Sequence, residues 1–129
     1  MTIYCCQCAT ETQCRLTGGP EVYPHRKDLA DKRFWRCREC RNYIGCHPGT
    51  ERPLGSIPTP ALRTVRMRIH GVIDPLWKSK RASRGKIYAE MSALLGYPFH
   101  TSEINNEAEG RRALEAARQV AARVTLSSP

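Results

Sequence analysis

The chain has 129 residues, enough for one domain with a small appended part, which excludes most large enzyme folds. Hydrophobic residues make up 40% and charged residues 26% of the sequence, so we expect a packed interior and not wholesale disorder. No apolar run in the sequence approaches the roughly 18 residues that a membrane-spanning helix needs. We therefore expect no membrane segment.

The charge of the chain is strongly positive and unevenly placed. Lysine and arginine number 21 against 12 acidic residues, a formal net charge of +9. Residues 61–90 hold 8 basic and 2 acidic side chains and so account for +6 of this excess. A local excess of this kind predicts a positive face and an acidic partner, either nucleic acid or an acidic protein surface.

The N-terminal residues, MTIYCCQCAT, show no basic leader followed by an apolar stretch and a small-residue cleavage site. We therefore expect a cytoplasmic protein in a reducing compartment. In that setting cysteines favour metal binding over disulfides.

The first 46 residues contain all seven cysteines of the chain: Cys5, Cys6, Cys8, Cys14, Cys37, Cys40 and Cys46. Two pairs have the C-x2-C spacing, Cys5 with Cys8 and Cys37 with Cys40. Each such turn lets two thiolates meet one metal ion, and two turns complete a four-sulfur tetrahedral shell for zinc. The spacing predicts one structural Zn²⁺ held by these two pairs.

Other uses of the cysteines remain open at this stage. Cys46 and His47 follow the second pair closely and offer an alternative shell with it, which would leave the first pair without a metal. Unligated buried cysteines are a further interpretation. Cys6 has one residue between it and Cys8, so we interpret it as a bystander, and the pattern assigns no role to Cys14.

The segment around these cysteines predicts a zinc ribbon over residues 1–50. Thr12–Thr17 and Glu21–Tyr23 suggest two short strands around the turn signal of residues 18–20. Arg33–Cys37 leads into the second cysteine pair, and Asn42–Gly45 leads out of it. A ribbon of this size has too little core to stand alone, so the metal should supply much of its folding free energy.

A helical part follows. Residues 51–58 are rich in proline and glycine and suggest a connector, and residues 59–126 suggest three or four helices packed on the ribbon. Thr59 and Pro60 start the first helix, and Asp74 with Pro75 suggests a second short one. Residues 83–96 and 102–124 suggest the last two helices. The fold class we expect is a small α+β chain.

Several motifs after the first cysteine pair resemble a zinc-finger-containing family of unknown function that is widespread in bacteriophages and prophages. They are Cys37-Arg-Glu-Cys40, the string YIGCHPGT over residues 43–50, and Pro53-Leu-Gly55. The resemblance covers roughly residues 5–120 and includes the string Asp74-Pro-Leu-Trp77. It implies a zinc ribbon with a helical extension and a phage setting, and it implies no known reaction. The chain departs from the family by having Cys6 inside the first pair and by reading Phe99-His100-Thr101-Ser102 near the end.

The function that the sequence favours is zinc-dependent binding of nucleic acid, with DNA ahead of RNA, by a non-enzymatic accessory protein in the host cell cytoplasm. Lysine and arginine side chains that neutralise phosphates supply affinity with little sequence preference. The predicted contact set is Arg63, Arg66, Arg68, Lys78, Lys80, Arg81, Arg84 and Lys86. A phage protein that binds and modulates an acidic host protein is the alternative.

A third hypothesis makes the chain a small metal-dependent nuclease. His47, His70 and His100, with Asp74, are its candidate residues because imidazole has a near-neutral pKa. No recognised nuclease signature or paired-carboxylate motif accompanies them. The sequence thus leans away from an enzyme, and it makes no prediction of oligomeric state.

Overall fold

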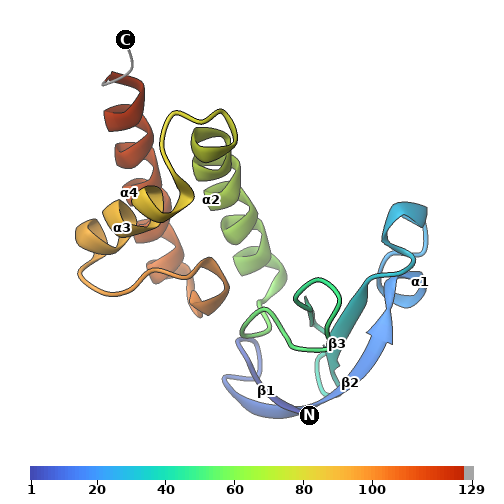
Figure 1. Ribbon diagram of the computed structural model, residues 1–129. Helices are drawn as coiled ribbons and strands as arrows, with labels where there is room; N and C mark the ends of the chain where they lie inside the picture. The colour runs from blue at the N-terminus through green and yellow to red at the C-terminus, as the bar shows by residue number, and fades with distance from the viewer. Residues whose placement is uncertain (127–129) are drawn as a thin grey trace. The chain divides into compact units, whose positions relative to one another are not determined.

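The computed structural model describes residues 1–126, which fall into two compact units (Figure 1). The first unit spans Met1–Pro60 and holds the strands, and the second begins at Ala61 and is helical. The expected α+β class is therefore confirmed. Among the described residues, no helix is long and apolar enough to cross a membrane.

The first unit is built on one antiparallel sheet of four strands in the order β1-β2-β3-β4. The strands are β1 (Thr2–Cys5), β2 (Thr10–Gly18), β3 (Arg33–Cys37) and β4 (Tyr43–Gly45). The β3 strand has the predicted bounds, whereas β1 was not predicted. Along β2, Thr12 and Cys14 are buried while Gln13 and Arg15 are exposed, the two-residue period of a half-buried strand.

The strand that we predicted over Glu21–Tyr23 is wrong. Residues Gly19–Val22 form a helical turn, α1, and a short 3-10 helix, η1, follows at Lys27–Leu29. Pro20 lies in the first turn of α1, where its missing N–H costs nothing. Gly19 packs directly against the backbone carbonyl of Leu29, and a side chain has no room there. This close approach turns the chain back before a second strand can form.

The interior of the first unit contains the cysteines themselves. Ile3, Ile44 and Ile57 are buried together with three thiols, those of Cys5, Cys14 and Cys37, in one cluster. Ile57 joins the β1 edge through its backbone N–H to the Tyr4 carbonyl at 2.9 Å. With so few large apolar side chains inside, the ribbon gains little hydrophobic stabilisation of its own.

The second unit contains α2 (Pro60–Lys78), α3 (Arg84–Leu95), a short 3-10 helix η2 (Thr101–Glu103) and α4 (Glu107–Leu126). The α3 bounds confirm the prediction. The Ser83 hydroxyl accepts a hydrogen bond from the Lys86 N–H at the start of α3, and Gly96 ends the helix with a left-handed φ of 83°.

The short helix predicted to begin at Asp74 and Pro75 is wrong, because α2 runs without a break to Lys78. A proline inside a helix removes one hydrogen bond to the residue four positions earlier and crowds its carbonyl. Here that residue is Gly71, which is exposed, so water can take the place of the missing partner. The proline also lies near the end of the helix, where little of the hydrogen-bond ladder remains to be lost.

The last helix begins later than predicted. Residues from Ser102 were expected to be helical, but α4 starts at Glu107. Asn106 and Glu109 explain the start, because the Asn106 side chain accepts the Glu109 N–H at 2.9 Å and donates to its carboxylate at 2.8 Å. The first of these bonds is an N-cap interaction, and it places the helix boundary.

The core of the second unit is an aliphatic cluster shared by all three helices. The side chains of α2 and α3 at its centre are large, whereas half of the buried hydrophobic side chains of α4 are alanines. Gly110 of α4 lies so close to α2 that an added Cβ would stand 2.7 Å from Val65 Cγ1. The absence of a side chain at Gly110 thus leaves room for Val65 of α2.

Candidate metal centre

Each of the four predicted zinc ligands stands at the end of a strand or in the turn that follows it. Cys5 is the last residue of β1 and Cys37 is the last residue of β3. Cys8 and Cys40 lie three residues further on, in the turns after these strands. The sheet aligns the two strand ends, and so it brings both cysteine pairs to one point.

The two cysteine turns have the same backbone geometry. The Ala9 N–H donates to the Cys5 carbonyl at 2.8 Å, and the Arg41 N–H donates to the Cys37 carbonyl at 3.0 Å. Both residues are left-handed, with φ of 58° at Ala9 and 68° at Arg41. Non-glycine residues adopt this conformation at a cost, so the repeated strain indicates that the turns are shaped to aim their sulfurs.

The four sulfurs meet the geometric requirement of a tetrahedral metal site. All four Sγ atoms lie within 4.8 Å of one another. Cys5 and Cys40 Sγ are 3.4 Å apart, and Cys8 and Cys37 Sγ are 3.9 Å apart. A zinc–sulfur bond of about 2.3 Å in a tetrahedron requires sulfurs about 3.8 Å apart. Their number, type and spacing fit one Zn²⁺, which when bound would fix the strand ends to each other.

The surroundings of Cys37 favour its ionised form. Burial opposes ionisation, but the Thr12 hydroxyl and the N–H groups of Glu39 and Cys40 approach the sulfur and outweigh it, holding the pKa of Cys37 at about 6. As a thiol, Cys37 donates to the Thr12 hydroxyl at 3.2 Å; as a thiolate, it accepts from that hydroxyl instead. Hydrogen-bond donors around a metal-bound thiolate support the ligand in this way.

The surroundings of two other sulfurs of the cluster, those of Cys8 and Cys40, oppose their ionisation. Burial, followed by the neighbouring thiols, raises the pKa of Cys8 to about 12. Burial and the same neighbours raise the pKa of Cys40 to about 11, although the Asn42 N–H opposes this. A divalent ion reverses the preference, because its charge stabilises thiolates that otherwise repel one another.

The three remaining thiols lie apart from this cluster. Cys6 Sγ faces the Ser56 hydroxyl at 3.8 Å, and Cys14 is buried opposite Cys37 in the β2–β3 register. Cys46 is half-buried and forms an isolated bridge with Pro53. Within residues 1–126, the four-cysteine cluster is the one group suited to hold a metal, and neither Cys46 nor His47 joins it. The alternative shell with the second cysteine pair is therefore not formed.

The predicted basic contact residues occupy α2, α3 and the turn between them. Five of them are exposed and follow one another within nine residues: Lys78, Lys80, Arg81, Arg84 and Lys86. On α2, Arg68 is exposed and Arg63 is half-buried.

Arg66 differs from the other members of the predicted contact set because it is buried, with 7% of its surface exposed. Its guanidinium donates to the Ile104 carbonyl from Nε at 3.2 Å and from Nη2 at 2.6 Å. These bonds tie α2 to the segment before α4. Its position fits a structural role, so Arg66 is not a candidate for contact with nucleic acid.

The candidate catalytic histidines have separate surroundings. His70 Nδ1 lies 3.3 Å from the Asp74 carboxylate one turn along α2, and the Trp77 indole N–H donates to the same carboxylate at 3.2 Å. His47 belongs to the loop after β4, and His100 is exposed just before η2. None of them belongs to a metal-ligand cluster within the described residues.

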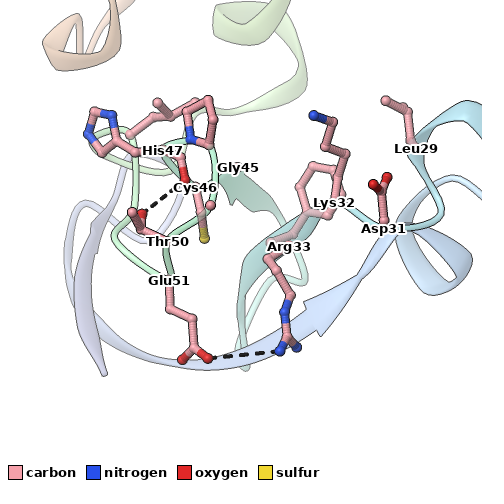
Figure 2. A pocket seen from close by; sticks show the side chains of 13 residues that line it. Leu29, Asp31, Lys32, Arg33, Gly45, Cys46, His47, Thr50 and Glu51 are labelled. Carbon is pink, nitrogen blue, oxygen red and sulfur yellow. Dashed lines mark hydrogen bonds and ion pairs between the residues drawn. The ribbon is translucent and has the colours of Figure 1, made fainter.

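A groove of about 830 Å³ opens in the first unit beside the loop after β4, and sequence reasoning did not predict it. Figure 2 shows Cys46 and His47 on one side and Lys32 and Arg33 on the other, with Glu51 paired to Arg33. Phe34, Gly45 and Leu54 contribute apolar surface. The YIGCHPGT string supplies one wall, so that string shapes a surface hollow and not a metal site.

Comparison with known proteins agrees with the cysteine geometry. The model of family DUF3268, a zinc-finger-containing domain, matches residues 1–121. No curated protein and no solved structure matches the chain.

Proposed function

Because the chain belongs to this zinc-finger-containing family, we propose that it is a non-enzymatic, zinc-dependent nucleic-acid-binding accessory protein of phage or prophage origin. We propose DNA, in preference to RNA, as its target in the host cell cytoplasm. The observation that carries the proposal is the run of exposed cations in residues 78–86, which we call the basic loop.

The basic loop has no acidic residue within it or next to it. The nearest acidic residues along the chain are Asp74 and Glu90. The Asp74 carboxylate already accepts the Trp77 indole N–H and lies against the His70 ring. Within residues 1–126, no ion pair involves a cation of the loop. The charge of the loop is therefore available to phosphates.

Four cations of the first unit contrast with this, because each is paired with a carboxylate. Arg15 and Arg36 both pair with Glu21, at 2.8 and 3.1 Å. Arg26 pairs with Asp28 at 2.7 Å. Pairing inside the unit cancels part of its positive potential. The basic loop is accordingly the strongest candidate for the phosphate contact.

The backbone at the α3 end of the loop adds to its positive potential. The loop ends in the first turn of α3, a helix of twelve residues. The unpaired N–H groups at the start of a helix carry partial positive charge and attract phosphate. Arg84 and Lys86 stand in this turn, so side-chain and backbone charge act in the same direction.

The role proposed for zinc is structural. All four sulfurs are taken up by the tetrahedral cluster, which leaves no open position for a substrate. The ion would stabilise the folded ribbon. Nucleic-acid binding would then depend on zinc only as far as the folded ribbon supports the rest of the protein.

A second candidate function is capture of a host protein. The groove beside the loop after β4 favours it, because it combines an apolar floor at Phe34 and Leu54 with a cation, Lys32, at its edge. Leu54 is 42% exposed, so its side chain is accessible to a partner. An apolar side chain is the partner chemistry that fits the floor of this groove.

The proposal is tested by fluorescence anisotropy with a labelled DNA duplex across a range of salt concentrations. Wild-type affinity should fall steeply with salt, because each neutralised phosphate releases counterions. Lys80→Glu with Arg81→Glu should abolish binding. Lys27→Glu with Arg118→Glu is the matched control, because it changes the net charge equally at exposed sites outside the basic loop. Equal losses in both double variants would contradict the assignment of the loop.

A further inference from the structure

A row of three side chains in contact runs from the interior of the second unit to its surface at the start of α3. Phe99 is buried, Tyr88 is half-buried and Arg84 is exposed. The Phe99 and Tyr88 ring centroids are 5.5 Å apart with an interplanar angle of 55°. Arg84 Cζ lies 4.4 Å from the Tyr88 centroid. The guanidinium therefore covers the Tyr88 ring and is the outermost member of this row.

The guanidinium is held in place without being neutralised. Arg84 Nη2 lies 3.3 Å from the Tyr88 hydroxyl oxygen, and the two residues are one helical turn apart on α3. Within residues 1–126, Arg84 has no carboxylate partner. Arginine is planar and weakly hydrated, and its face stacks well on aromatic rings. Its exposed side can accept a further flat group.

We infer that Arg84 on Tyr88 is a stacking platform for an unpaired nucleobase, so that the basic loop binds single-stranded nucleic acid in preference to duplex. This inference rests on the proposed function. In a duplex the bases are stacked on one another and present only their edges in the grooves. A single strand presents base faces, and arginine or aromatic side chains bind them with little sequence preference.

The other end of the basic loop has a similar pair. Lys78 Nζ lies 5.5 Å from the ring centroid of Trp77, which is half-buried. The Trp77 indole N–H is bonded to Asp74, which fixes the ring at the end of α2. Two cation–aromatic pairs thus flank the loop. Lys80, Arg81 and Lys86 lie between or beside them to contact phosphates.

The test compares zinc-loaded full-length protein on a labelled mixed-sequence single strand and on the duplex of the same sequence, at one salt concentration. Arg84→Lys keeps the charge but removes the planar group. It should weaken single-strand binding roughly fivefold or more, the fold-change at the lower end of base–aromatic stacking, and leave duplex binding nearly unchanged. Arg118→Lys, at an exposed position of α4 outside the loop, should change neither.

The possible outcomes separate this inference from the proposed function. If wild-type protein binds neither probe, the proposed function is wrong and the inference is lost with it. If wild type binds both probes equally, or if Arg84→Lys weakens both to the same extent, the function stands and the stacking platform is wrong. Circular dichroism of the Arg84→Lys variant should give the wild-type helical spectrum, which serves as the control for folding.

Discussion

Two glycines of the helical unit should respond in opposite directions to the same substitution. Gly110 is buried on α4 against α2, and a Cβ added there would stand 2.7 Å from Val65 Cγ1 and 3.6 Å from Leu62 Cδ1. Gly71 is exposed on α2, and a Cβ added there meets nothing within 4 Å. Comparing the same substitution at these two glycines separates the effect of helix propensity on stability from the effect of packing.

The expected magnitudes follow from these distances. Replacing glycine by alanine inside a helix stabilises it by about 0.5–1 kcal/mol, and this gain applies at both sites. A contact of 2.7 Å forces Val65 or the α4 backbone to move, and overpacking of this kind costs typically 1–3 kcal/mol. Gly71→Ala should therefore stabilise the protein by up to ~1 kcal/mol, and Gly110→Ala should destabilise it by ~1–2 kcal/mol.

The measurement is thermal unfolding of zinc-loaded protein followed by far-UV circular dichroism. For a domain of this size, 1 kcal/mol shifts the Tm by about 4–8 °C. The difference between the two variants reports the packing cost alone, because the propensity gain is common to both. A Gly110→Ala variant that melts at or above the wild-type temperature would refute the close approach of α4 to α2.

Three further predictions concern the first unit. Purified protein should contain one zinc per chain, and Cys5→Ser should lose it and lower the Tm, whereas Cys46→Ser should retain it; metal analysis and melting decide both. Thr12→Val removes the hydroxyl 3.2 Å from Cys37 Sγ and should weaken zinc binding roughly 10-fold or more in a chelator competition; equal affinity would mean that this hydroxyl does not support the thiolate. Hydrogen bonds from Arg15 and then Arg36 lower the pKa of Glu21 to about 2, so the stability that it contributes is complete at neutral pH and is lost as the pH falls from about 4.5 toward 2. Glu21→Gln should therefore melt below wild type when the zinc-loaded proteins are compared at pH 7; equal melting temperatures would contradict this.

The spacing of the cysteines was sufficient to predict the four-sulfur cluster. Two C-x2-C turns aim their thiols by local backbone geometry, and local geometry is encoded in a few neighbouring residues. The α3 bounds were predictable for the same reason, because Ser83 and Gly96 act on their own turns. The break expected at Pro75 failed, because the local preference of proline was outweighed by a helix that could continue past it.

The structure shows Arg66 buried against the Ile104 carbonyl and Arg84 exposed on Tyr88, although the two arginines look alike in the sequence. The hydroxyl that approaches Cys37 and the groove beside the loop after β4 had no local signal either. The sequence by itself therefore determined the metal-binding chemistry, the α+β class and the position of the positive charge along the chain. Only the tertiary structure decided which cations are buried, paired or exposed, because that depends on residues far apart in the chain that folding brings into contact.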